Sequence, residues 1–130
     1  MVQGADSIVV VEDDSGLRQA IERVLEAAGY QPRTFGSAEA ALASGEGHSA
    51  SCLVLDVRLP GLSGFDLRDR WAAAGVGAPV IFITAHDEPA ARRRALAAHA
   101  DYMPKPFEGH ELLETVARAL RPPPATDELP

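Results

Sequence analysis

Three short segments of the chain are apolar at every position instead of alternating between apolar and polar side chains. They cover residues 8–11, 52–55 and 80–83. A strand with one face in water would alternate, so these runs indicate strands that are covered on both faces, as in parallel sheets. Two further short strands are predicted over residues 31–35 and 100–103.

Between the strands, apolar residues recur three or four positions apart, which is the spacing of one helix face. The clearest case is residues 15–28, where Asp14 or Ser15 can cap the first turn and Gly29 ends the helix. Further helices are predicted over residues 37–43, 64–74 and 88–97, the last with Pro89 at a first helical position, and around an apolar stripe at 112–120.

Strands and helices alternate along the chain, which predicts an α/β fold: a five-stranded parallel sheet with helices on both faces. The expected strand order is 2-1-3-4-5, the flavodoxin-like (βα)5 three-layer sandwich. One domain is expected over residues 7–120, after an N-terminal tail of residues 1–6. Residues 121–130 begin with an arginine and three prolines, which cannot continue a helix, and they are expected to form a Pro-rich tail or linker.

The composition narrows the class of protein. With 130 residues and 46% apolar side chains, the chain fits one globular domain. Its single cysteine, Cys52, excludes an internal disulfide, favours a reducing compartment and is expected to be a buried small hydrophobe. No apolar run approaches the roughly 18 residues of a membrane span and no secretion signal is evident, so a cytoplasmic location is expected. The net charge of −7 disfavours direct nucleic-acid binding.

Polar side chains follow the predicted strands, at the point where each strand ends. Because parallel strands point the same way, these side chains gather at one edge of the sheet, where ligands bind if the strand order reverses there. The reversal lies between the first and third strands, so two acidic segments are expected to meet. The residues that follow the strands are Glu12, Asp13, Asp14, Asp56, Thr84 and, after Pro104, Lys105.

Several carboxylates in one cleft raise one another's pKa unless a cation lies between them. Mg²⁺ suits a site that offers a couple of carboxylates, waters and a phosphate. A carboxylate beside such an ion can act as a nucleophile and form an aspartyl phosphate. Lys105, the one lysine beside eleven arginines, would supply a second compact cation, and Thr84 a hydroxyl donor.

Four motifs follow one another along the chain: Val-Val-Glu12-Asp13-Asp14-Ser15, Leu-Asp56-Val-Arg58-Leu-Pro60-Gly61-Leu62-Ser63-Gly64, Ile-Thr84-Ala85-His86 and Tyr102-Met-Pro-Lys105-Pro106-Phe107. Together they resemble the receiver domain of response regulators in two-component signalling, over about residues 7–120. Residues 60–64 and 79–86 are similar to receivers of the nitrogen-fixation regulator type, which often precede a LuxR-type helix-turn-helix.

The resemblance implies that Asp56 accepts a phosphoryl group from a phosphohistidine of a sensor histidine kinase or phosphotransfer protein. It implies that Glu12 and Asp13 hold Mg²⁺, together with the Asp56 carboxylate and the backbone carbonyl of Arg58. Glu12 stands where many relatives carry aspartate, so its longer arm can reach the metal through a water.

Further roles follow from the same resemblance. Thr84 corresponds to the switch hydroxyl, and Lys105 to the lysine that pairs with a phosphoryl oxygen. Tyr102 corresponds to an aromatic residue that moves inward with Thr84. The remaining implied features are a small Ala85 that leaves the phosphoryl group accessible, a cis bond from Lys105 to Pro106, and Arg58 and His86 as positions that modulate the phosphate lifetime.

Two departures from the family pattern lie near the fifth strand. Ala98-His99 stands where relatives usually carry Gly-Ala, and Pro104 directly precedes Lys105. These residues put the backbone path into the fifth strand in question, but they leave the acceptor untouched.

The function implied is a phosphorelay domain that catalyses only its own phosphorylation and dephosphorylation and is no turnover enzyme. Phosphorylation would change the face of the fourth helix, fifth strand and fifth helix, which an output partner or a second copy of the chain would read. The alternatives are an inactive interaction module and an aspartyl phosphatase. A phosphatase needs a second acid at position 58, where this chain has Arg58. Either the domain stands alone or its tail begins a linker to an output domain.

Simpler structural roles remain open for several of these residues. Asp14 can merely cap the first helix, and Thr84 can bond nearby backbone. Tyr102 can be plain core packing, which is compatible with a switch role. The Arg92-Arg93-Arg94 run is expected to be a solvated face more than a docking patch, and the four histidines have no metal-ligand spacing.

Overall fold

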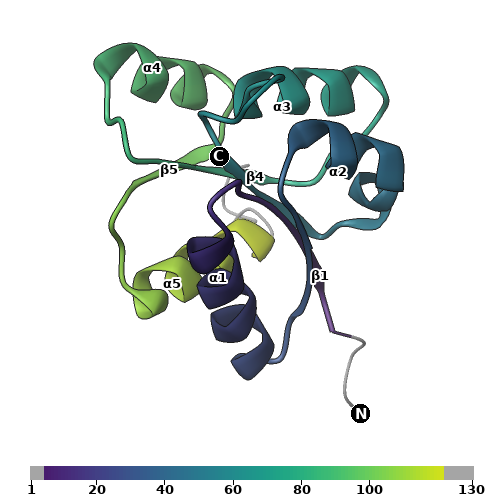
Figure 1. The fold of residues 1–130 in the computed structure, drawn as a ribbon, viewed down its shortest axis with the longest axis vertical. Coiled ribbons are helices and arrows are strands. Elements are labelled where there is room, and N and C mark those ends of the chain that lie inside the picture. The colour runs from purple at the N-terminus through teal and green to yellow at the C-terminus, as the bar shows by residue number, and fades with distance from the viewer. Residues whose placement is uncertain (1–4, 122–130) are drawn as a thin grey trace, which may run out of the picture.

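The computed structural model describes residues 5–121, which form a five-stranded sheet between two layers of helices (Figure 1). In chain order the elements are β1 (Ser7–Val11), α1 (Ser15–Ala27), β2 (Gln31–Phe35), α2 (Ala38–Ser44), the 3₁₀ helix η1 (Glu46–Ser49), β3 (Cys52–Asp56), α3 (Gly64–Ala73), β4 (Val80–Thr84), α4 (Pro89–Ala97), β5 (Asp101–Pro104) and α5 (Gly109–Leu120).

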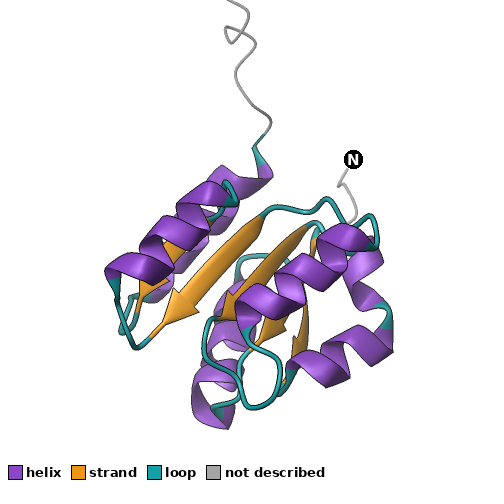
Figure 2. Ribbon diagram, turned by 90° about the horizontal axis from the view of Figure 1, so that it is seen from above, coloured by secondary structure: helices purple, strands orange, loops and turns teal. Residues whose placement is uncertain are grey.

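All four strand pairings are parallel, and the strand order is β2-β1-β3-β4-β5, which confirms the predicted fold class and order. Figure 2 shows the sheet running between its covering helices. The chain leaves β1 toward β2 on one side and returns to β3 on the other. The strand order therefore reverses between β1 and β3, as expected.

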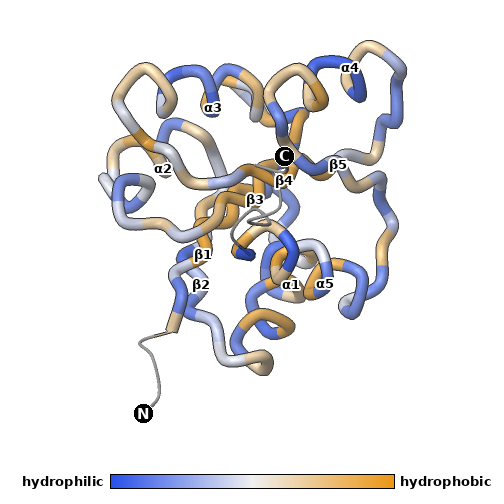
Figure 3. Tube along the Cα trace, turned by 180° about the vertical axis from the view of Figure 1, so that it is seen from behind, coloured by the Kyte–Doolittle hydropathy of each residue, from blue (hydrophilic) through white to orange (hydrophobic). Residues whose placement is uncertain are grey.

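The two faces of the sheet carry separate apolar cores, which explains why the central strands do not alternate. In β1, Val9 and Val11 pack with residues of α2, α3 and α4, whereas Ile8 and Val10 pack with residues of α1 and α5. Every residue of β3 and β4 is buried. Figure 3 shows the same arrangement as an apolar centre along the strands.

The structure corrects several predicted boundaries by one residue. Ser37 and Glu88 lie outside α2 and α4 as their N-caps, and β5 starts at Asp101. Asp14 caps α1, its carboxylate accepting from the amide of Leu17 at 3.0 Å. The helix η1 was not predicted, because its four residues are too few to show a helical period.

The residues outside 5–121 include most of both predicted tails, so residues 1–4 and the prolines 122–124 lie outside the described part of the chain. Within it, the helices are all too short or too polar to cross a membrane. Cys52 is fully buried, as expected, and burial raises the pKa of its thiol to about 12.

Candidate functional site

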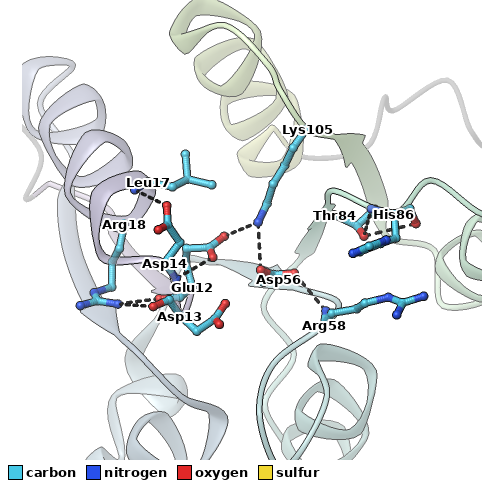
Figure 4. A network of polar contacts seen from close by, with 10 residues as sticks. All are labelled: Glu12, Asp13, Asp14, Leu17, Arg18, Asp56, Arg58, Thr84, His86 and Lys105. Atoms are coloured by element: carbon cyan, nitrogen blue, oxygen red, sulfur yellow. Dashed lines mark hydrogen bonds and ion pairs between the residues drawn. The ribbon is translucent and has the colours of Figure 1, made fainter.

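The sheet register brings the acidic segments together at one edge. Val11 pairs with Leu55, so Glu12 and Asp56 follow at neighbouring positions. Asp56 pairs in turn with Ile83, and Thr84 pairs with Pro104, which places Lys105 at the same edge. Figure 4 shows the side chains of Glu12, Asp56 and Lys105 pointing toward one another at this edge. The predicted convergence of Glu12, Asp13, Asp56 and Lys105 is confirmed.

The centre of the site is an ammonium group between two buried carboxylates. Lys105 Nζ lies 2.7 Å from Glu12 Oε1 and 2.9 Å from Asp56 Oδ2. The side chains of Glu12 and Asp56 are only 1% and 6% exposed, and that of Lys105 is 16% exposed. Little water reaches these charges, so each depends on its partners for stabilisation.

The pKa of Glu12 is raised to about 7, mainly by burial and in smaller part by the neighbouring Asp56 carboxylate. The Lys105 ammonium and the amide of Asp14, which donates to Glu12 Oε2 at 3.0 Å, act in the opposite direction. Burial alone would lower the pKa of Lys105, but its close contacts with the two carboxylates outweigh this effect and raise the pKa. The pocket therefore keeps a protonated lysine beside a carboxyl group that titrates near neutral pH.

A divalent cation fits the donor set. Oxygen atoms of Glu12, Asp13 and Asp56 all lie within 4.8 Å of one another. Within residues 5–121, no hydrogen-bond donor is aligned on the buried Glu12 Oε1, although Lys105 forms an ion pair with it. Exposed Asp13 borders the pocket on its solvent side. Hard cations prefer such oxygen donors, and the described histidines contribute to no comparable group.

The loop between β3 and α3 holds one face of Asp56. The amide of Arg58 donates to Asp56 Oδ1 at 3.0 Å, while the amide of Val57 donates to the carbonyl of Ile83. A Cβ on Gly64 would overlap the backbone carbonyl of Asp56, so only glycine allows α3 to begin this close. Ser63 and Asp66 form a capping box that fixes the start of α3.

The hydroxyl of Thr84 faces the β4–α4 loop and not the acceptor. Its oxygen accepts from the amide of His86 at 2.9 Å and lies 3.3 Å from the carbonyl of the same residue. Thr84 is fully buried, whereas Ala85 and His86 are exposed. The Thr84 hydroxyl thus makes the local backbone contact considered for it. A role as the switch hydroxyl stays compatible with this arrangement.

Tyr102 takes part in an exposed network at the start of α4. Its hydroxyl donates to Asp87 Oδ1 at 3.2 Å, and the Arg92 guanidinium lies 4.9 Å from the centre of its ring. Arg92 also binds Asp87 through two hydrogen bonds, at 2.7 and 2.8 Å. The Tyr102 ring packs partly against the core, so the packing role expected for it is present beside a polar one.

The two departures before Lys105 leave the strand intact. Pro104 is the last residue of β5 and pairs with Thr84, whose carbonyl accepts from the amide of Lys105 at 2.7 Å. His99 takes a left-handed conformation with a φ of 57° in the turn before β5. The bond from Lys105 to Pro106 is cis, as the resemblance implies.

Three residues around the site were missed from the sequence. Arg18 donates to the carbonyl of Glu12, Glu39 accepts from the amide of Leu62 in the β3–α3 loop, and Glu88 pairs with Arg58 at 3.0 Å. For Arg18 a signal existed, since it lies one helical turn beyond Asp14. The other two pairs join residues far apart in sequence, and no local pattern marks them.

Comparison with known proteins agrees with this geometry. Residues 8–117 match the family described as response regulator receiver domain. Nodulation protein W of Bradyrhizobium diazoefficiens is 42% identical over 113 residues, which are 86% of this chain and 50% of that protein. Transcriptional regulatory protein FixJ of the same organism is 35% identical over 115 residues, 88% of this chain and 56% of that protein. The chain thus spans about half the length of these relatives.

Solved structures share the fold along nearly the whole domain. The BeF3-activated DrrB receiver domain superposes with a TM-score of 0.81 at 29% identity, covering 89% of this chain and 97% of that one. Chemotaxis protein CheY4 of Vibrio cholerae gives 0.78 at 26% identity, covering 89% and 99%. With the acidic pocket at the strand-order reversal and the family match over residues 8–117, the chain belongs to the response regulator receiver domains, regulatory domains of two-component signalling.

Proposed function

We propose that this domain accepts a phosphoryl group on Asp56 from the phosphohistidine of a sensor histidine kinase or phosphotransfer protein in the cytoplasm. The observation that carries the proposal is the position of the Asp56 carboxylate. One of its oxygens lies 2.9 Å from the Lys105 ammonium, and the other accepts from the Arg58 amide at 3.0 Å. Glu12 and Asp13 lie beside it.

In the transfer, a carboxylate oxygen of Asp56 attacks the phosphorus, the P–N bond breaks, and the imidazole nitrogen keeps the bonding electron pair and takes up a proton. Lys105 balances the charge that gathers on the phosphoryl oxygens. Glu12, Asp13, Asp56 and the Arg58 carbonyl are the groups that would hold Mg²⁺, which supplies further positive charge to those oxygens. Lys105 and the Arg58 amide hold and orient the Asp56 carboxylate.

Hydrolysis of the resulting acyl phosphate needs only a water on the open side of the site. Ala85 and His86 are exposed there, and Ala85 carries no side chain large enough to cover the phosphoryl group. Arg58 and His86 are the residues proposed to set how long the phosphate lasts. The domain thus catalyses its own phosphorylation and dephosphorylation, without acting on a separate substrate.

The switch we propose runs through the β4–α4 loop. A phosphoryl group on Asp56 would attract the Thr84 hydroxyl, which must then leave the backbone of His86. The next residue, Asp87, binds the Tyr102 hydroxyl. Movement of this short loop therefore reaches Tyr102 and alters the face formed by α4, β5 and α5.

That face is the proposed contact for a second copy of the chain or for an output domain. Leu96 of α4 is 74% exposed, and Arg92 and Arg93 are exposed on the same helix. Nodulation protein W and FixJ extend well beyond the matched region, so an output domain of the LuxR type that controls transcription is proposed to follow the linker. Nucleic-acid binding would then belong to the output domain, because this chain carries a net charge of −7.

The test is phosphorylation by acetyl phosphate in the presence of Mg²⁺, followed by intact mass and by the acid stability and base lability of the product. The wild type should gain one phosphoryl group, and Asp56→Asn should gain none. Asp69→Asn makes the same chemical change at an exposed carboxylate on α3 and should be phosphorylated normally. Failure of the wild type to form an acyl phosphate would favour the inactive interaction module.

A further inference from the structure

We propose that Arg18 is a positioning residue for the divalent-cation site. It acts by holding the backbone of Glu12 and Asp13, the acidic pair. This inference rests on the proposed function, because it assumes that Glu12 and Asp13 bind the cation. Arg18 Nη1 donates to the carbonyl oxygen of Glu12 at 2.8 Å and lies 3.4 Å from that of Asp13. It therefore contacts both members of the pair through their main-chain carbonyls.

The position of Arg18 follows from the way α1 begins. Asp14 caps the helix, and its carbonyl accepts from the amide of Arg18 at 2.9 Å, which places the arginine one turn above the acidic segment. Figure 4 shows Arg18 reaching Glu12 and Asp13 from the side opposite to Lys105. The guanidinium is closely seated, since a Cβ on Gly36 would come within 3.2 Å of Arg18 Nη1.

The other contacts of the segment hold Glu12 more firmly than Asp13. The amide of Glu12 donates to the carbonyl of Phe35 at 3.0 Å, and its side chain is bound by Lys105 and the amide of Asp14. The side chain of Asp13 is exposed at the rim of the pocket. Arg18 spans the two carbonyls and so limits rotation of the peptide that joins them, which orients the Asp13 carboxylate toward Asp56.

Two opposite effects are expected when Arg18 is removed, and their balance is what makes the inference testable. Loss of a positive charge near the site favours a divalent cation by electrostatics alone. Loss of the carbonyl contacts frees the acidic segment, so binding must restrain it again. Groups that orient metal ligands commonly change affinity by 10-fold or more, so the second effect should dominate.

The decisive measurement is the Mg²⁺ dissociation constant of the whole chain by isothermal titration calorimetry. Arg18→Ala should weaken binding roughly 10-fold, and Arg18→Lys, which keeps the charge and one donor group, should fall between this variant and the wild type. Arg23→Ala is the matched control, since it removes the same charge from an exposed position on the same helix. It should bind Mg²⁺ as the wild type does or slightly more tightly.

A second readout separates positioning from chemistry. The rate of Asp56 phosphorylation by acetyl phosphate, followed against Mg²⁺ concentration, should reach half its maximum at a higher concentration for Arg18→Ala. Its maximal rate at saturating Mg²⁺ should match that of the wild type. If circular dichroism shows that Arg18→Ala is unfolded, the same measurements are made on Arg18→Lys and Arg18→Gln.

The inference is overturned if the Arg18 variants bind Mg²⁺ as Arg23→Ala does, or more tightly than the wild type. It is also overturned if saturating Mg²⁺ fails to restore the maximal rate, because Arg18 would then act on the transfer itself. A wild type that neither binds Mg²⁺ nor becomes phosphorylated contradicts the proposed function instead, and the two failures are therefore distinguishable.

Discussion

Two regions of the domain use the same interaction with different consequences. In the pocket, Lys105 lies 2.7 and 2.9 Å from two carboxylates, and in the network at the start of α4, Arg92 lies 2.7 and 2.8 Å from one. The pocket carboxylates are 1% and 6% exposed, whereas Arg92 and Asp87 are 54% and 42% exposed. The two regions therefore differ in solvent access and not in the distances between their charged groups.

The pKa directions show what this difference does. In the pocket, burial raises the pKa of Glu12 to about 7 despite the nearby ammonium. In the exposed network, the hydrogen bonds from Arg92 lower the pKa of Asp87. The pocket thus holds carboxylate charges that burial disfavours and that an incoming divalent cation can stabilise. The exposed network can break and re-form at little cost, as a switch contact must.

The largest effect should follow from removing the cation of the buried region. Lys105→Met leaves two buried carboxylates without their common partner, so urea unfolding at pH 8 without metal should show a loss of about 3 kcal/mol. Arg92→Met makes the matched change in the exposed network and should alter stability little. Equal losses for the two variants would remove burial as the distinguishing factor.

The pH dependence of stability should differ between the regions as well. In the native state the pKa of the Glu12 carboxyl is about 7, whereas the ordinary pKa of a glutamate is 4.5. Between these pH values the native state binds more protons than the unfolded state, so the metal-free protein should lose stability as pH rises. Urea unfolding of Glu12→Gln should lack this loss. Glu114→Gln, an exposed control on α5, should retain it.

A change of cation shape in the pocket should separate phosphorylation from signalling. Lys105→Arg keeps the charge but replaces a compact ammonium with a broad guanidinium, which fits one phosphoryl oxygen poorly. We expect this variant to accept phosphate on Asp56 yet to show smaller beryllofluoride-induced changes in the amide NMR signals of α4 and β5. Changes as large as those of the wild type would show that the lysine is replaceable.

The smallest expected effect lies in the exposed network. Burial raises the pKa of Tyr102, and its hydrogen bond to Asp87 adds to this. Asp87→Asn should therefore lower the pKa of Tyr102 part of the way toward its usual value. Tyrosinate absorbance measured in a Tyr30→Phe background, which leaves Tyr102 as the only tyrosine, gives this pKa directly. No change would mean that the Tyr102–Asp87 contact is not maintained in solution.

The fold was largely predictable because its central strands are buried on both faces. Runs such as residues 80–83 cannot be mistaken for amphipathic strands, and the polar residue after each run marks a strand end. The edge strand β5 was placed one residue early, since a partly exposed strand has no such unbroken run. The short helix η1 was not predicted. Gly47 within it packs closely against the Trp71 indole, but this contact joins residues far apart in sequence and leaves no local pattern.

The site was predictable only as far as strand ends define it. Asp56 and Thr84 end their strands, and Glu12 and Lys105 directly follow theirs, so topology alone brings them to one edge. Glu39 and Glu88 bind loop residues that lie 23 and 30 positions away, and their roles depend on how helices settle against loops. No periodicity records such contacts, because one side chain meets one distant partner.

The order of residues was therefore enough to identify the layers, the strand order and the acidic edge, since periodicity and parallel topology are local and repetitive features. The tertiary structure decided how those residues behave. It placed Lys105 between Glu12 and Asp56, turned the Thr84 hydroxyl toward His86, and set Arg18 on the carbonyls of the acidic pair. Burial and distance between separate elements control these properties, and both exist only once the chain has packed.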